Sequence, residues 1–250
     1  MSIGYVRALR ILHRAFGHYP AGHRLHMLIR FATCPFPRTI DDVPAGARVL
    51  EIGSGHALYA RLIAEERARE VVAVDPDERK SLLPPPSPKI RKVAGYDDCI
   101  RGTFDAVVIY DATYRMPLEV RRAVFERAFA RLAPGGTFVL KDMDATSFKM
   151  KWARFQEWLS DTFLNVSIGS GFFYQTPAEL RAMLSEIGFT DFQARAIDRF
   201  YPHPHMIFTA RRPPVPRSSS GSSEFLGDIP ADQPGATPRN RGTRGTRGTS

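Results

Sequence analysis

The sequence predicts an α/β protein with a doubly wound, mostly parallel seven-stranded sheet, an N-terminal helical cap and a closing antiparallel strand. Two observations carry this prediction. Between residues 48 and 144, short apolar runs alternate with runs of helical apolar spacing, which is typical of a parallel sheet with right-handed crossovers. The first apolar run, residues 49–52, leads into a loop that contains Gly53 and Gly55. Because glycine allows positive φ and close approach of a ligand, we expect this loop to bind a nucleotide or a similar ligand.

The first 40 residues are expected to form a basic helical cap. The apolar side chains of its first helix share one face: Tyr5, Leu9, Leu12 and Phe16. Its arginines lie opposite that face: Arg7, Arg10 and Arg14. Residues 17–22 interrupt this helix, a second follows at residues 23–31, and Pro35 and Pro37 end the cap. Such a cap either packs on its own domain with a solvated basic face or contacts an anionic membrane surface, and the sequence leaves both interpretations open.

The remaining elements follow in chain order. The expected strands are residues 49–52, 71–74, 90–93, 104–110 and 137–140, with a closing pair at 192–197 and 206–210. The expected helices are residues 58–67, 118–132, 149–164 and 176–187. Proline-rich residues 83–88 predict a shortened second crossover, and residues 133–136 predict a turn before the fifth strand. Thr176, Pro177 and Glu179 form the N-terminal signature of the last helix, which Gly188 ends.

Composition sets the limits on domains and partners. The 250 residues suffice for one α/β domain, expected at residues 41–211, while residues 212–250 have the low-complexity composition of a disordered tail. Cys34 and Cys99 give neither a disulfide framework nor metal-ligand spacing, so no metal is expected. The sequence shows neither a signal peptide nor an apolar run of membrane-spanning length, which predicts a cytoplasmic protein. The net charge is +9 and no acidic residue precedes Asp41, which favours anionic partners.

The loop after the first strand separates the nucleotide-binding families. A dinucleotide dehydrogenase needs a third glycine where Leu58 stands, and no phosphate-binding GxxxxGK[ST] run occurs. Glu51 precedes Gly53 by two positions, and Asp75 ends the second strand about twenty residues after the glycines. Together these residues resemble the cofactor site of class I S-adenosylmethionine-dependent methyltransferases. The resemblance covers residues 46–211, with Ala57 at a position where that family often has a third glycine.

The resemblance implies S-adenosylmethionine as cofactor and assigns residues to it. The implied cofactor residues are Glu51, Gly53, Ser54 and Gly55 on the methionine and ribose side, Asp75 for the ribose hydroxyls, Pro76 and either Asp97 or Asp98 beside the adenine, and Tyr110 facing the methyl-transfer site.

Candidate catalytic residues lie beyond the fourth strand and before the last one. Residues 111–114 (DATY) are similar in outline to the Asp-Pro-Pro-Tyr signature of amino-methylating nucleic-acid enzymes, but they lack both prolines. Asp111 and Tyr114 are therefore candidates, although Asp111 is equally a candidate for a hydrogen-bonded strand terminus. His203 can deprotonate a hydroxyl, or it can be a surface imidazole in a proline-bracketed turn.

The resemblance thus predicts an enzyme that methylates a small-molecule acceptor. Residues 149–174 are rich in aromatic side chains, and insertions after the fifth strand cover the acceptor pocket in many class I methyltransferases. We therefore expect O-methylation of an apolar, aromatic or lipid-like compound. The alternatives are an RNA methyltransferase, favoured by the basic segments, and a non-catalytic scaffold subunit. Nucleic acid is disfavoured as a partner because the sequence has no recognisable RNA-binding module. No oligomeric state is predicted.

Overall fold

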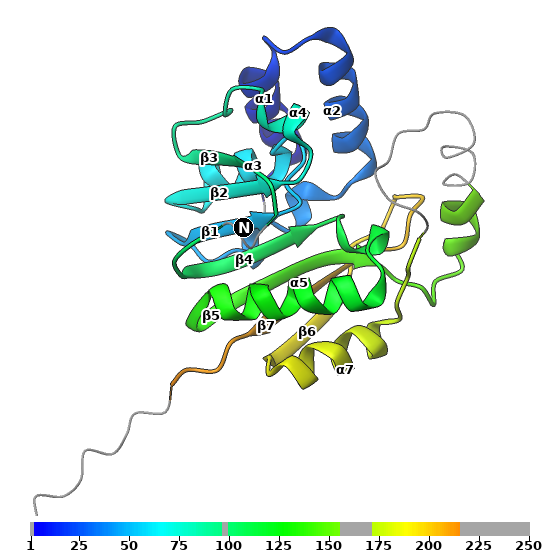
Figure 1. Cartoon of the computed structure of the whole chain (residues 1–250). Helices are drawn as coiled ribbons and strands as arrows, with labels where there is room; N and C mark the ends of the chain where they lie inside the picture. Colours follow the sequence, from blue (N-terminus) through cyan, green and yellow to red (C-terminus); the bar gives the residue numbers. More distant parts are fainter. Residues whose placement is uncertain (1–2, 97–99, 156–171, 216–250) are drawn as a thin grey trace, which may run out of the picture. The chain divides into compact units, whose positions relative to one another are not determined.

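The computed structural model describes residues 3–96, 100–155 and 172–215 (Figure 1). The strands are β1 Arg48–Ile52, β2 Glu70–Asp75, β3 Ile90–Ala94, β4 Phe104–Tyr110, β5 Leu132–Met143, β6 Thr190–Ala196 and β7 His205–Arg211. The α-helices are α1 Tyr5–Phe16, α2 Ala21–Thr33, α3 Leu58–Glu66, α4 Glu78–Ser81, α5 Leu118–Arg131 and α7 Pro177–Ile187. Three 3-10 turns are η1 Phe36–Arg38, η2 Ile40–Asp42 and η4 Thr113–Arg115.

The described strands form one seven-stranded sheet in the order β3-β2-β1-β4-β5-β7-β6. The pairs β1–β2, β2–β3, β1–β4 and β4–β5 are parallel, whereas β7 runs antiparallel to both β5 and β6. This confirms the predicted fold class. The chain builds outward from β1 to β3 and then returns to β4 on the other side of β1. Ligands in such sheets bind at the carboxyl ends of the strands where the order reverses, which here is between β1 and β4.

Successive side chains of each strand point to opposite faces of the sheet, and each face lies in its own hydrophobic core. Val49 of β1 lies in the core shared with α1 and α3, and Leu50 lies in the core shared with α5 and α7. In Figure 1, α5 crosses in front of the sheet. Helices thus cover both faces of the sheet, and the loops at the carboxyl ends of its strands begin from packed strands.

The helix α1 packs on α3, but with a face that differs from the predicted one. Its buried residues are Ala8, Ile11, Leu12, Ala15 and Phe16. Tyr5 and Leu9, which the apolar stripe placed inside, are each 39% exposed. The two buried alanines explain the difference, because small side chains let the helix lie close to its neighbour on that side. The prediction was therefore right for Leu12 and Phe16 only.

The second crossover is shortened, as predicted. The helix α4 has only 4 residues, and the proline-rich segment follows it. Tyr19 Oη donates to the carbonyl of Pro84 at 2.5 Å, and Arg61 donates to the carbonyl of Pro86. These bonds tie the linker to the turn after α1 and to α3.

The fifth strand starts earlier than predicted. Residues 133–136 do not form a separate turn but belong to β5, whose pairing with β4 jumps from Phe104–Leu132 to Ala106–Thr137. Gly135 has φ of +77° in this irregular stretch, and a bulge of this kind adds residues to one strand without ending it.

The ends of α7 agree with their sequence signature. Thr176 Oγ1 accepts from the backbone of Glu179 at 3.2 Å, and the Glu179 carboxylate accepts from the backbone of Thr176 at 2.7 Å. Gly188 follows the helix with φ of +110°. The helix expected at residues 149–164 is observed from 150 to 155, and the rest of it lies outside the described residues.

The described residues, which end at Val215, belong to one compact unit. The division into a cap, a catalytic domain and a disordered tail stays a prediction. Among the helices in the described part of the chain, none is long and apolar enough to cross a membrane.

Candidate active site

The loop between β1 and α3 has the backbone that its glycines predict. Gly53 and Gly55 have φ of +72° and +55°. A Cβ on Gly53 would lie only 2.6 Å from the Cβ of Ala112, so no larger residue fits there unless the backbone moves. The backbone N–H groups of Gly53 and Ser54 both donate to the carbonyl of Val74, at 2.9 and 3.0 Å. The loop is therefore held at the carboxyl ends of β1 and β2.

Ala57, at the position of the family's third glycine, has φ of +60°. A non-glycine residue in this left-handed conformation costs about 1–2 kcal/mol. The methyl group is fully buried, which offsets part of that cost.

The carboxylate of Asp75 connects the two loops of the predicted cofactor site, the one between β1 and α3 and the one after β2. Its Oδ2 accepts from the Gly55 backbone at 2.7 Å, and its Oδ1 accepts from the Asp77 backbone at 2.9 Å. Lys80 Nζ lies 3.8 Å from the same Oδ1. Each carboxylate oxygen has a second lone pair for a ligand hydroxyl. Pro76 beside it is exposed, whereas Asp97 and Asp98 lie outside the described residues.

Glu51 is a buried carboxyl group at the end of β1, with a side-chain oxygen that has no hydrogen-bond partner among the described residues. Burial, reinforced by the nearby charge of Asp75, raises the pKa of Glu51 to about 8, against the lowering effect of a hydrogen bond from the Ala60 backbone. A cationic ligand group beside this carboxyl would favour its ionised form. The unpartnered oxygen and the glycine cradle therefore fit the cationic methionine end of S-adenosylmethionine.

The raised pKa of Glu51 predicts a pH dependence of stability. The folded form holds a proton at pH values where the unfolded carboxyl, with a pKa of about 4.3, has lost it. Its contribution is thus complete below about pH 4.3 and is lost as pH rises toward 8. We expect the ligand-free protein to lose a few kcal/mol of unfolding free energy across this window, since one pKa unit corresponds to about 1.4 kcal/mol. Urea unfolding from pH 6 to 8.5 should show this decline in the wild type and a flatter profile in Glu51→Gln. Identical profiles would contradict it.

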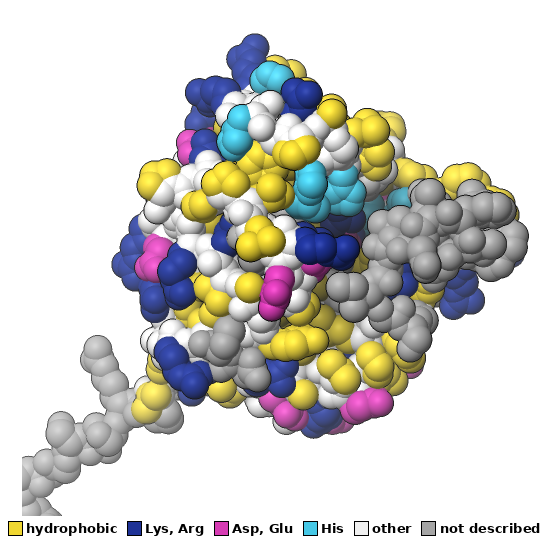
Figure 2. All heavy atoms as spheres, turned by 45° about the horizontal axis from the view of Figure 1, so that its top comes forward, with side chains coloured by type: hydrophobic (Ala, Val, Ile, Leu, Met, Phe, Trp, Pro, Cys, Tyr) yellow, Lys and Arg dark blue, Asp and Glu magenta, His cyan; other side chains and the backbone are white. Residues whose placement is uncertain are grey.

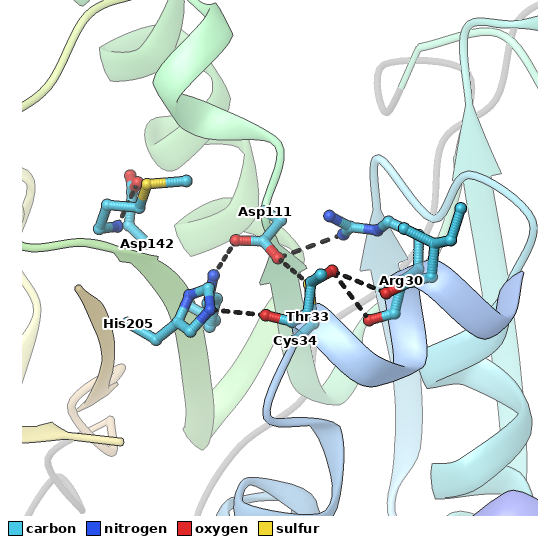
Figure 3. Close-up of polar contacts among 9 residues, drawn as sticks. Arg30, Thr33, Cys34, Asp111, Asp142 and His205 are labelled. Carbon is cyan, nitrogen blue, oxygen red and sulfur yellow. Dashed lines mark hydrogen bonds and ion pairs between the residues drawn. The ribbon is translucent and has the colours of Figure 1, made fainter. Parts of the chain in front are cut away.

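Asp111 lies at the centre of a buried polar cluster, shown in Figure 3. Its backbone has φ of +55°, and its side chain is 2% exposed. Arg30 Nη2 and Cys34 Sγ each lie 3.2 Å from its Oδ2, and Lys141 Nζ contacts its Oδ1. Burial acts to raise the pKa of Asp111, but Lys141 and Arg30 outweigh it and lower the pKa. The carboxylate stays ionised with its donors in place, a geometry that suits the hydrogen-bonded strand terminus better than a base.

Two histidines flank this cluster. His205 Nε2 lies 2.8 Å from the carbonyl of Thr33, and burial together with Lys141 lowers the pKa of His205 to about 3. The half-buried ring of His203 lies 5.7 Å from that of His205, and burial, followed by Lys141, lowers the pKa of His203. Both imidazoles are therefore neutral at pH 7. The sequence places His205 in the same proline-bracketed turn as His203, with a surface imidazole as one interpretation. The structure instead buries His205 at the start of β7, where strand alternation points it inward.

The two predicted tyrosines lie in different surroundings. Tyr110 is buried, and its ring stacks on Tyr59 at 4.5 Å and on Phe36 at 4.9 Å between centroids. Tyr114 is half-buried in η4, where its ring lies parallel to Phe172 at 6.2 Å and to Tyr174 at 6.1 Å. We call Tyr114, Phe172 and Tyr174 the aromatic cluster. It stands immediately beyond the carboxyl end of β4.

A buried arginine on α5 positions the aromatic cluster. Arg121 donates to Gln175 Oε1 at 2.5 Å, to the carbonyl of Thr113 at 2.8 Å and to the carbonyl of Phe173. These acceptors flank the three rings, so one guanidinium fixes both chain segments. Arg121 is not among the predicted site residues. Its signal is its place three and four residues before Val124 and Phe125, on the apolar face of the helix.

Three histidines that were not predicted as site residues connect helix α2 to the β1–α3 loop, which we call the glycine loop. The rings of His23 and His26 lie 5.2 and 5.1 Å from the ring of His56, which follows Gly55. Burial, followed by the nearby positive groups, lowers the pKa of His56 to about 4. In the described part of the chain, no group of three or more His, Cys, Asp or Glu side chains could hold a metal ion.

The fold is the Rossmann-like fold of S-adenosylmethionine-dependent methyltransferases. A family model described as a methyltransferase domain matches residues 23–194. The chain belongs to this family: it is an S-adenosylmethionine-dependent methyltransferase, and S-adenosylmethionine is its methyl donor. No curated protein matches the chain.

Solved structures share the fold at low sequence identity. A possible histamine N-methyltransferase from Thermotoga maritima has a TM-score of 0.58 and 15% identity, over 82% of this chain and 99% of that one. A 1,6-didemethyltoxoflavin-N1-methyltransferase from Burkholderia thailandensis, with bound 1,6-didemethyltoxoflavin and S-adenosylhomocysteine, has a TM-score of 0.54 and 18% identity, over 84% and 91%. An O-methyltransferase candidate from Nostoc punctiforme has a TM-score of 0.53 and 16% identity, over 70% of this chain and 53% of that one. The chain thus spans about half the length of the Nostoc protein.

Proposed function

We propose that this methyltransferase transfers a methyl group to an oxygen of a small apolar, aromatic or lipid-like acceptor. The observation that carries the acceptor class is the aromatic cluster, whose half-buried rings are nearly parallel, with interplanar angles of 4° and 7°. Parallel ring faces beyond β4 suit a flat or apolar molecule. The similarity in fold to the 1,6-didemethyltoxoflavin-N1-methyltransferase supports a small-molecule acceptor.

The residues of the chain bind and orient, while S-adenosylmethionine supplies a methyl group on a positively charged sulfur. In this proposal Asp75 accepts from the ribose hydroxyls, and Glu51 faces the cationic methionine end. Gly53, Ser54 and Gly55 form the surrounding backbone, and α2 covers it. Catalysis then depends on alignment of the acceptor oxygen with the methyl group and on exclusion of water.

His203 is the proposed base for the acceptor hydroxyl. It is neutral at pH 7 and only half-buried, so its ring can accept the proton of an acceptor hydroxyl. His205 is held by Thr33 and is more deeply buried, which leaves His203 as the accessible imidazole of the pair. Asp111 acts indirectly here, as an ion-pair anchor beneath the site.

Cofactor binding is tested by calorimetric titration of the protein with S-adenosylhomocysteine. We expect Asp75→Ala to weaken binding about 10- to 100-fold, because a hydrogen bond to a charged group contributes about 1.5–3 kcal/mol. Asp105→Ala is the matched control, since Asp105 also accepts from a backbone N–H, that of Arg48 at 2.8 Å, but at the amino end of the sheet. Equal affinity in Asp75→Ala would contradict the ribose assignment. No heat and no thermal shift in the folded wild type would favour a scaffold.

The acceptor class is tested by screening hydroxylated aromatic and lipid-like compounds for methyl transfer. We expect Tyr114→Leu to raise KM more than it lowers kcat, because the ring binds the acceptor in both ground and transition states. We expect His203→Gln to lower kcat with little change in KM. Turnover of RNA with no turnover of small molecules would overturn the proposal.

A further inference from the structure

Helix α2 buries only one of its 13 residues, Met27. A helix packed on one domain usually buries a full apolar stripe. Here Leu25 and Leu28 are 60% and 51% exposed, and Ile29 is exposed as well. The neighbouring α1 exposes Val6 and Leu9. Two adjacent helices thus present large apolar side chains to solvent.

A groove runs between these two helices. Its cavity has a volume of about 300 Å³. Its apolar lining comes from both helices: Leu9, Leu12 and Phe16 of α1, and Leu25, Leu28 and Phe31 of α2. Figure 2 shows the region of α1 and α2 at the top of the view, with yellow hydrophobic side chains among dark blue and cyan basic ones. We call this surface, together with the protruding Val6 and Ile29, the α1–α2 surface.

The charge on this surface has one sign. No acidic residue precedes Asp41 in the sequence. Arg7 and Arg30 are neutralised by Glu66 and Asp111. The other arginines of the two helices form no ion pair with any carboxylate of the described residues: Arg10, Arg14 and Arg24. Arg24 and His13 line the groove itself. An apolar groove surrounded by arginines that lack an ion pair with the described carboxylates is complementary to a lipid with an anionic headgroup.

We propose that the α1–α2 surface docks on an anionic phospholipid bilayer, with its apolar side chains at the boundary between headgroups and acyl chains and its arginines at the phosphates. A bilayer fits better than one bound amphiphile, because Val6 and Ile29 protrude outside the groove that a single molecule would fill. It also fits better than a nucleic acid, whose phosphates would use the arginines but leave the exposed leucines in water.

The opposite side of α2 gives this docking a consequence for the enzyme. His23 and His26 of the same helix contact His56 beside the glycine loop. One helix therefore separates the docking surface from the cofactor loop, which places the proposed active site next to the bilayer. The docking inference goes beyond the proposed function and does not depend on the acceptor.

The inference is tested by vesicle co-sedimentation of the full chain without cofactor. Vesicles of phosphatidylcholine are compared with vesicles containing about 30 mol% phosphatidylserine. We expect binding at least about 10-fold tighter to the anionic vesicles. The double variant Leu25→Gln/Leu28→Gln keeps the net charge and should weaken that binding about 10-fold or more. The matched control is Leu118→Gln/Val120→Gln on α5, at positions 46% and 45% exposed, and it should bind like the wild type.

Three results would overturn the inference. If the α2 variant binds vesicles like the wild type while Arg10→Gln/Arg24→Gln does not, the contact is electrostatic adhesion without insertion. If vesicles do not bind but a monomeric anionic detergent does, the groove holds a single amphiphile. If only transfer RNA binds, the basic side chains serve nucleic acid. Titration of each variant with S-adenosylhomocysteine keeps this outcome separate from cofactor binding, since the α1–α2 surface faces away from the glycine loop.

Discussion

Replacing Asp111 by alanine is expected to lower the free energy of unfolding by about 3–5 kcal/mol, because it leaves a buried positive charge without its partner. The side chain of Lys141 is fully buried against this carboxylate, whereas Arg30 is 32% exposed and can reach water. Most of the lost unfolding free energy therefore comes from Lys141, whose charged amino group would stay buried without a counter-charge. Urea unfolding at pH 7 measures it directly.

The pH profile of the same variant gives a second readout. Because the pKa of Asp111 is lowered in the folded protein, its contribution is present above the unfolded pKa of about 3.9 and is lost as pH falls below that value. The stability difference between wild type and Asp111→Ala should thus shrink in acid.

A double variant controls for the loss of the side chain itself. Asp111→Leu combined with Lys141→Met removes both charges, and apolar replacement of a buried ion pair is often nearly neutral. We expect it to recover most of the stability lost in Asp111→Ala. If the double variant is as unstable as the single one, packing or the φ of +55° at this position matters more than charge.

Replacing Gly53 by alanine is expected to cost about 2–5 kcal/mol of unfolding free energy and to displace the loop between β1 and α3, where we propose that the cofactor binds. The left-handed φ of +72° contributes about 1–2 kcal/mol for a residue with a Cβ. Overlap with the Ala112 Cβ at 2.6 Å contributes about 1–3 kcal/mol more, since both backbones are held by strands. The temperature of thermal unfolding and the affinity for S-adenosylhomocysteine should both be lower than in the wild type.

Ala112→Gly separates the two costs of that change. In the Gly53→Ala/Ala112→Gly protein the overlapping atom is gone, so about 1–3 kcal/mol should return while the cost of the φ angle remains. Gly55→Ala is a useful comparison, because a Cβ there would meet no atom within 4 Å and only the φ of +55° opposes it. A double variant no more stable than Gly53→Ala would show that the backbone angle alone makes glycine necessary.

The sheet could be predicted because each of its strands is marked by a short sequence pattern of its own. Apolar runs fix each strand, and the alternation with helices fixes the parallel order. The glycines of the β1–α3 loop and the capping box at Thr176 are short signals of this kind. The start of β5 could not be predicted, because Gly135 and Gly136 serve equally in a turn and in a bulge.

The polar cluster around Asp111 could not be predicted because its members are far apart in sequence. Arg30 comes from α2, Cys34 directly follows that helix, and Lys141 comes from β5. Each alone looks like an ordinary charged or apolar position. Only the crossing of α2 over the ends of β4 and β5 makes them one group, and that crossing leaves no local pattern in the chain.

The same crossing bears on how this enzyme and its relatives can diverge. The first 40 residues contribute two of the donors to Asp111, Arg30 and Cys34, whereas Asp111 itself directly follows β4. An exchange of residues 1–40 between relatives would therefore separate Arg30 and Cys34 from the carboxylate that accepts from both. Recombination at the boundary near residue 40 should succeed only when residues 30 and 34 travel together with 111 and 141. We therefore expect the first 40 residues to tolerate substitutions on their outer face better than exchange as a whole segment.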